Sequence, residues 1–325
     1  MKGETMRSKS ILVLAMVVCA IAVANVALAT TDTFGTGANR FTINFVPISG
    51  NTNPVSGYGI VNYDYRMGTY EITNDQWNKF ITSLGMPLTG NPTDAYDRSS
   101  FYIDLNVPTN GVSWYEAAQF VNWLNTSTGH QAAYKFTGMQ GTSDYTLATW
   151  SASEAAGGTN LYRHKDAFYF LPTEDEWVKA AYWNGTMLQT YSNALSADLL
   201  PGLPGYPDKP DFTKWNYAPT PGSEPWDVGS GVEELNGTFD MMGNIWEWME
   251  SPYNDPGYGT TSNRGWRGGS FTSGSLFISS SYRSANAVPQ SENDFDFTGF
   301  RVASIPEPAT LLLLALGVII VRRKR

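Results

Sequence analysis

The stretch SWYEAAQFVNWLNTSTG, residues 113–129, carries the clearest helix signal in the chain. It opens with Ser113 and Glu116, which have the spacing of a capping box: the hydroxyl caps one free backbone amide and the carboxylate reaches back to another. Behind the cap, apolar residues recur at helical spacing on one face, namely Trp114, Ala117, Ala118, Val121 and Leu124. Gly129 then stops the pattern. We predict a helix here, with its aromatic side chains in the core.

The same start signal occurs twice more, as Thr73-x-x-Gln76 and as Thr173-x-x-Glu176. Each is followed by an apolar helical face and then by a glycine. Loosely alternating segments at 58–69, 266–271 and 300–303 predict short strands, whereas 186–239 is dense in Pro, Gly, Asn and Asp without a period. Few helices, short strands and long loops predict a loop-rich α+β fold with little regular secondary structure.

The N-terminal residues 1–29 have the three parts of a secretory signal peptide. Basic residues precede an apolar run from Ile11 to Val23, and Ala27-Leu28-Ala29 supplies a small-x-small cleavage site. The alternative, a transmembrane helix, needs about 17–25 apolar residues and leaves the Ala-x-Ala unexplained. We therefore expect residues 1–29 to be removed on export.

The C-terminal residues 305–325 form a second targeting segment. Pro306-Glu307-Pro308 is an extended break, Ala309–Val321 is an apolar run short for a full membrane span, and four basic residues follow. This tail resembles the PEP-CTERM sorting signal of Gram-negative bacteria. The resemblance implies export, transient insertion in the inner membrane and processing by an exosortase; the alternative is a permanent anchor. Both place the domain outside the cytoplasm.

Charge and cysteine content exclude several functions for the remaining chain. Seven of the 21 basic and two of the 30 acidic residues lie in the two ends, which leaves 14 and 28 and a net charge of about −14. Such acidity argues against nucleic acid as a partner and is compatible with hard cations. The single cysteine, Cys19, lies in the predicted signal peptide, so the exported part has no thiol or disulfide. Paired acids such as Glu174 with Glu176, and Glu233 with Glu234, are interpreted as helix-cap and surface charges.

Six segments in series carry a family resemblance that spans residues 58–304. They read YRMGTYEITNDQWNKF, GVSWYEAAQFVNWLN, FLPTEDEWVKAAYW, GTFDMMGNIWEWMES, RGWRGGSF and TGFRVAS. In this order they resemble the sulfatase-modifying-factor family, that is, the formylglycine-generating enzyme domain. The resemblance implies a variant of the C-type-lectin-like fold. We expect one such domain over residues 30–304.

The resemblance also implies where a copper site would be. Active members hold copper with two cysteines after the Arg-Gly-Gly-Ser segment, and these positions fall on Ser273 and Ile278. Cu(I) selects soft thiolates, which neither residue offers, so no copper is expected. Ser270 and Trp246 match positions that line the oxygen and copper pocket; their alternative role is packing. A second branch uses histidine-held iron, but His130 and His164 are isolated in predicted loops.

The ligands of the calcium site that the resemblance implies are better preserved in this sequence than those of the copper site. Its ligands would be Asp240, Gly243, Ile245 and Glu247, and two carboxylates with carbonyls from a glycine-kinked loop suit Ca²⁺. The alternative is that Glu247 only accepts hydrogen bonds from backbone amides of its own loop. A second family site would involve Asn216 and the carbonyl of Tyr217, but its other half is not identified at Asp227–Ser230.

Three functions are compatible with these features. The first is a catalytically empty, calcium-stabilised binding module at the cell surface or in the matrix, with exopolysaccharide or envelope glycan as the partner class. In it, aromatic residues of the loops, such as Tyr206, Trp215 and Tyr253, would stack on the ligand; the alternative is that they belong to the core. The second is an oxidase related to formylglycine generation that uses a redirected or non-thiol metal site. The third is a structural matrix protein without a small ligand.

Overall fold

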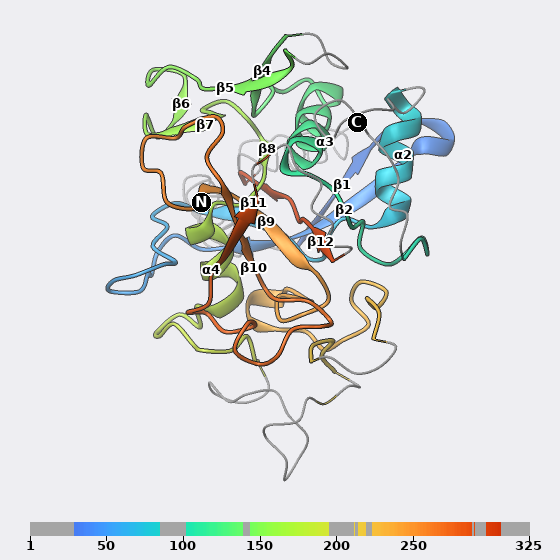
Figure 1. The fold of residues 1–325 in the computed structure, drawn as a ribbon, viewed down its shortest axis with the longest axis vertical. Helices are drawn as coiled ribbons and strands as arrows, with labels where there is room; N and C mark the ends of the chain where they lie inside the picture. The colour runs from blue at the N-terminus through green and yellow to red at the C-terminus, as the bar shows by residue number, and fades with distance from the viewer. Residues whose placement is uncertain are drawn as a thin grey trace, which may run out of the picture. The chain divides into compact units, whose positions relative to one another are not determined.

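The computed structural model describes residues 29–84, 102–138, 144–194, 211, 214–218, 223–287, 289 and 297–306. Their compact unit runs from Thr30 to Ile305. Its larger sheet has five antiparallel strands in the order β1-β2-β3-β13-β8 (Figure 1). The strands are β1 Thr30–Phe34, β2 Phe41–Ile48, β3 Tyr65–Gly68, β13 Ala303–Ser304 and β8 Tyr169–Phe170.

The second sheet has four strands in the order β11-β10-β9-β12, with β12 parallel to β9 and the other pairs antiparallel. They are β11 Ser284–Ala287, β10 Arg264–Arg267, β9 Trp246–Pro252 and β12 Thr298–Gly299. Two small antiparallel pairs complete the strands: β4 Lys135–Thr137 with β5 Thr146–Ala148, and β6 Ala155–Ala156 with β7 Asn160–His164. Figure 1 shows these two pairs together at one end of the unit.

All three predicted helices form where their capping boxes place them. They are α2 Asn74–Leu84, α3 Trp114–Ser127 and α4 Glu174–Tyr182, and the reciprocal hydrogen bonds of all three boxes are present. The two short 3-10 helices are η1 Gly37–Asn39 and η2 Leu235–Gly237. In the described part of 186–239, η2 is the only helix or strand, as the lack of periodicity predicted.

The predicted strands are shorter than their sequence patterns. The expected strand at 266–271 stops at Arg267 because Gly268 and Gly269 both adopt left-handed backbone, with φ of 95° and 75°. The pattern at 300–303 forms a strand only at its end, since Phe300 and Val302 bond instead to the loop around α2 and to Gly68. Alternation alone cannot detect such breaks.

The aromatic residues of the helices lie in the core, as predicted. Trp114, Trp77 and Trp177 are each at most 1% exposed. Two indoles also join α3 to β9: Trp114 donates to the carbonyl of Met249 at 3.0 Å, and Trp248 donates to that of Val112 at 2.9 Å. Burial of these rings is therefore combined with satisfied N–H groups, which fixes the helix along the strand.

A fully buried arginine connects the two sheets. Arg301, between β12 and β13, donates to both oxygens of Glu247 on β9 at 2.6 and 2.7 Å. The same guanidinium donates to the carbonyls of Gly68 and Thr69 at 3.1 and 3.3 Å and to that of Phe239 at 3.0 Å. One side chain thus holds strands of both sheets and the loop before β9.

No helix within these described ranges is both long and apolar enough to cross a membrane. The predicted apolar tail segment, Ala309–Val321, and residues 1–28 of the predicted signal peptide lie outside the described residues.

Replacement of Arg301 by lysine is expected to lower the free energy of unfolding by about 3–5 kcal/mol, because it leaves the buried Glu247 carboxylate and three carbonyls short of donors. Urea denaturation of the variant and of the matched exposed control Arg40→Lys measures this. The control should change stability by less than about 0.5 kcal/mol. Equal effects for the two variants would contradict the role given to Arg301.

Candidate functional site

The loop that follows β10 is the segment in which the resemblance implies a copper site, and its side chains at the implied positions are buried. Ser270 is 0% and Ile278 0% exposed, and Ser273 is 7% exposed. A Cβ placed on Gly269 would lie 2.9 Å from Cγ2 of Ile278 and 3.3 Å from Cβ of Ser273, so these two side chains flank the same glycine. The structure therefore brings together the two positions that would carry thiolates, and fills them with a hydroxyl and a hydrocarbon.

The hydroxyls of this loop bond to one another. Ser270 donates its amide to Oγ of Ser273 at 2.9 Å, and the two Oγ atoms are 3.2 Å apart. Oγ of Ser270 is also 2.9 Å from Oγ1 of Thr272. Ile278 packs in the second core cluster, and its carbonyl accepts from the hydroxyl of Tyr182 at 2.8 Å. Trp246 is 7% exposed and contacts Phe277 and Tyr282, so its packing role is realised.

The two carboxylates of the implied calcium segment, Glu247 and Asp240, have different hydrogen-bond partners. Glu247 accepts from Arg301 and, at 2.7 Å, from the indole of Trp177, rather than from amides of its own loop. Asp240 instead accepts from the amide of Gly229 at 2.7 Å. Gly243 and the fully buried Ile245 lie between them along the chain. Among the described residues, no group of three or more His, Cys, Asp or Glu side chains is arranged to hold a metal, and the calcium set remains a prediction.

Asp240 belongs to a buried acidic cluster that the sequence did not reveal. Burial raises the pKa of Asp240 to about 6. Burial also raises the pKa of Glu71 and Glu234, and the neighbouring charge of Asp240 raises both further. Oε1 of Glu71 has no hydrogen-bond partner among the described residues. Buried carboxyl groups that lie close to one another favour their protonated forms.

The implied second calcium site lies against the same loop. Asn216 accepts from the amide of Asn244 at 2.8 Å, and its own amide group donates to Oδ1 of Asn244 at 3.1 Å. Tyr217 is 1% exposed. Asp240 and Asn244 both adopt left-handed backbone, with φ of 61° and 67°, which is uncommon outside glycine and marks a tightly specified turn.

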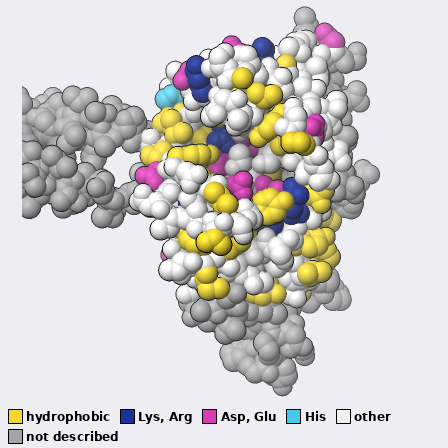
Figure 2. Space-filling model, turned by 90° about the vertical axis from the view of Figure 1, so that its left-hand side faces the viewer, with side chains coloured by type: hydrophobic (Ala, Val, Ile, Leu, Met, Phe, Trp, Pro, Cys, Tyr) yellow, Lys and Arg dark blue, Asp and Glu magenta, His cyan; other side chains and the backbone are white. Residues whose placement is uncertain are grey.

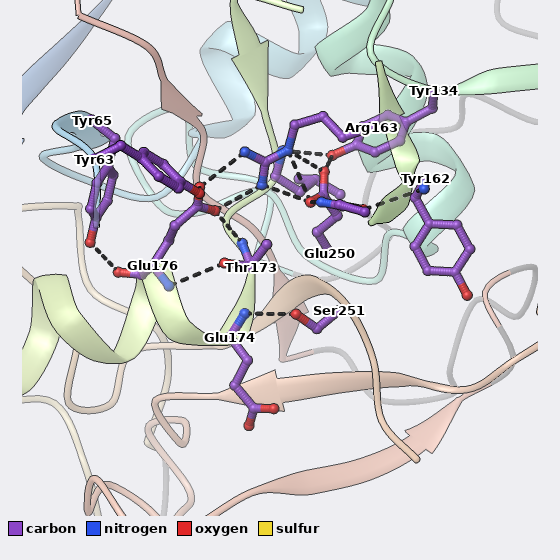
Figure 3. Close-up of polar contacts among 12 residues, drawn as sticks. Tyr63, Tyr65, Tyr134, Tyr162, Arg163, Thr173, Glu174, Glu176, Glu250 and Ser251 are labelled. Carbon is purple, nitrogen blue, oxygen red and sulfur yellow. Dashed lines mark hydrogen bonds and ion pairs between the residues drawn. The ribbon is translucent and has the colours of Figure 1, made fainter. Parts of the chain in front are cut away.

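A second charged centre joins β7, α4 and β9. Figure 3 shows Arg163 between Glu176 and Glu250. Its guanidinium donates to both oxygens of Glu176 at 2.8 and 3.0 Å and to both oxygens of Glu250 at 2.7–3.0 Å. Burial alone would raise the pKa of Glu176, but Arg163 outweighs it and the pKa falls. The hydroxyl of Tyr63 donates to Glu176 at 2.6 Å, and the hydroxyl of Tyr134 donates to Glu250 at 2.8 Å.

An adjacent cluster holds Glu174. Its carboxylate accepts from Arg267 at 2.8 Å and from Arg283 through two bonds of 2.6 Å. Glu176 is the helix-cap acid that its spacing predicted, with the capping box of α4 complete. Glu174 and Glu234 are 4% and 2% exposed, so an interpretation of these two as surface charges is wrong. The capping-box spacing identified Glu176, but only the fold brings Arg163, 13 residues before it, to this acid, and Arg283, 109 residues away, to Glu174.

The other predicted ligand-contacting residues have mixed outcomes. Trp215 is 6% exposed in the second core cluster, so of its two alternatives, ligand contact and core, the core is found. Tyr253 is half-buried beside Arg283, and Tyr206 lies outside the described residues. His130 stacks on Phe168 and His164 contacts Trp150, so both histidines pack locally.

Comparison with known proteins identifies the family. The model of the sulfatase-modifying factor enzyme 1-like domain matches residues 33–305. The chain belongs to this family. The PEP-CTERM protein-sorting motif matches residues 304–325, which marks a protein exported to the cell envelope whose sorting signal is processed by an exosortase. No curated protein matches the sequence.

Solved structures agree on the fold. Treponema denticola variable protein 1 is 20% identical with a TM-score of 0.56, over 85% of this chain and 99% of that one. CarF is 20% identical with a TM-score of 0.55, over 82% and 99%. PvdO from Pseudomonas aeruginosa is 16% identical with a TM-score of 0.52, over 86% and 92%. The expected loop-rich, C-type-lectin-like α+β fold is confirmed; at these identities the likeness extends to the fold alone.

The buried acids predict an unusual pH dependence. Because the pKa of Asp240 rises from 3.8 to about 6 on folding, the folded state favours its protonated form, and stability falls as pH rises from about 4 to about 6. In calcium-free buffer, Asp240→Asn should therefore be more stable than the wild type at pH 7, by up to roughly 3 kcal/mol, and similar at pH 4.

Urea denaturation at the two pH values measures this, with exposed Asp104→Asn as the matched control. Calcium at pH 7 should stabilise the wild type and not the Asp240→Asn variant. An Asp240→Asn variant that is equally destabilised at both pH values would contradict the assignment.

Proposed function

We propose that the chain is a catalytically empty member of its family that acts as an exported binding module. One observation carries the proposal: the two positions that would supply thiolates to copper are Ser273 and the fully buried Ile278. With Cys19 as the only cysteine of the whole sequence, no other residue of the chain can provide a thiolate after signal-peptide removal.

The retained scaffold suits a binding role. Its loops are long, yet buried ion pairs such as those of Arg301 and Arg163 hold the strands that carry them. Loops on a rigid scaffold can vary in sequence without loss of the fold. Display on the outer surface or in the extracellular matrix, with exopolysaccharide or envelope glycan as the partner, follows the exported location. Calcium at Asp240 would neutralise the buried acids and stiffen the loop before β9.

The competing function is an oxidase with a redirected metal site. Ser270 and Trp246 favour it, since both keep the positions that line the pocket in active members. The hydroxyl of Ser270 is bonded to Ser273 and Thr272, and a hydroxyl is not deprotonated at neutral pH. The first function is therefore the better supported.

Copper titration with a cysteine-peptide oxidation assay separates the two functions. The wild-type protein should bind no Cu(I) tightly and turn over no peptide. The double variant Ser273→Cys/Ile278→Cys should gain a Cu(I) site, because both side chains flank Gly269. Ser273→Cys, which supplies one thiol, is the control and should bind Cu(I) much more weakly. Stoichiometric copper with turnover by the wild type would contradict the proposal.

A further inference from the structure

A hollow with charged side chains at its centre and apolar ones around it lies on the side of the unit that carries β7 and α4 (Figure 2). We propose that this hollow, which we call the tyrosine cleft, binds an uncharged hexopyranose unit of a polysaccharide. We assign to it five residues that lie around the ion pairs of Arg163 and Arg283, namely Tyr58, Tyr63, Tyr253, Tyr258 and Asp175. The inference rests on the proposed binding function and gives it a place and a ligand class.

One wall of the tyrosine cleft is the loop from β9 to β10. Asp255 holds this loop closed: its carboxylate accepts from the amides of Gly257 and Gly259, each at 2.8 Å, and from the hydroxyl of Ser262. These bonds lower the pKa of Asp255, and the bond from the Ser262 hydroxyl has the largest effect. Tyr253 and Tyr258 lie on this closed loop, and Tyr258 has a left-handed backbone with φ of 56°. The two rings are therefore positioned before any ligand arrives.

The opposite wall is the loop around Tyr58. The amide of Gly59 donates to Oδ1 of Asp175 at 2.9 Å, which ties this loop to the first turn of α4. The guanidinium of Arg283 lies between the walls, 5.0 Å from the ring centre of Tyr58 and 4.3 Å from that of Tyr253. Since Glu174 holds Arg283 through two bonds, the separation of the walls is fixed.

The exposed groups of the cleft match a sugar ring. Tyr58, Tyr253 and Tyr258 are partly exposed, and within the described residues their hydroxyls have no hydrogen-bond partner. Oδ2 of Asp175 likewise has none within those ranges. A tyrosine offers an apolar face and a polar tip at low entropic cost, and a carboxylate oxygen accepts from neighbouring hydroxyls. A pyranose presents an apolar C–H face and a ring of hydroxyls, which is the complement.

The charges of the cleft select against acidic sugars. Arg267 and Arg283 share the buried carboxylate of Glu174, whereas Arg163 pairs with both Glu176 and Glu250, so three arginines face three buried glutamates. Asp175 adds a fourth carboxylate, which no described cation pairs and which accepts from the amide of Gly59. A uronic acid would meet this carboxylate without a free cation, whereas an uncharged hexose meets only hydrogen-bonding partners.

Isothermal titration of the full-length protein with neutral and uronic oligosaccharides tests the inference. The neutral set is cello-, malto-, laminari- and manno-oligosaccharides, and the acidic set is oligomers of alginate and polygalacturonate. We expect binding within the neutral set only. Tyr258→Ala and Asp175→Asn should each weaken it about tenfold or more, as loss of a central contact does. Tyr258→Phe, which keeps the ring, should retain most of the affinity.

Matched controls are Tyr145→Ala, at the residue before β5, and exposed Asp104→Asn, which should change affinity less than about twofold. Unchanged thermal midpoints show that the cleft variants are folded. If the cleft variants bind neutral oligosaccharides with unchanged affinity, the proposed site is overturned while the binding function stands. Binding of uronic oligomers alone, or of none, would overturn the ligand class. Copper-dependent peptide turnover would instead contradict the proposed function itself.

Discussion

The ion pair between Arg301 and Glu247 is the interaction on which the rest of the structure depends. Both side chains are fully buried, and the guanidinium also satisfies three backbone carbonyls. A buried arginine is stabilised when its charge and its donors are matched, and this one is matched by strands of both sheets and the loop before β9. It therefore selects one arrangement of segments that have few regular hydrogen bonds of their own. The indole of Trp177 on α4 completes the set.

Buried ion pairs take the place of disulfides in this exported domain. The only cysteine is Cys19, yet long loops have to be held in one conformation. Arg163, Arg267 and Arg301 each bind glutamates that are at most 4% exposed. These pairs join residues far apart in the sequence, as a disulfide would, and planar guanidinium groups suit such paired contacts. The low share of charged residues, 16%, thus understates how much charge lies inside.

The loop after β10 combines a glycine turn with two side chains, Ser273 and Ile278, that offer no thiolate. The glycines before Ser270 keep their turn, and Ser273 and Ile278 still flank Gly269. What differs is the chemistry of two side chains, so the loop packs as core. At the opposite end of β9, the loop from β9 to β10 carries the partly exposed rings of Tyr253 and Tyr258 next to paired charges. Rigid walls of this kind reduce the entropy lost on binding, which favours recognition of a weakly interacting ligand.

The sequence by itself determined the helices, their first residues, the core aromatics and the family, because capping boxes and helical periodicity act over a few residues. It also determined that Ser273 and Ile278, the two positions implied as copper ligands, offer no thiolate. It could not determine where strands end, since that depends on the left-handed turns at Gly268 and Gly269. Nor could it show that Glu174 and Glu234 are buried, that Trp215 lies in the core, or that Glu247 binds Arg301. Only the tertiary structure decided these, because a charge or a ring becomes a core or a surface group through partners that lie far away in the sequence.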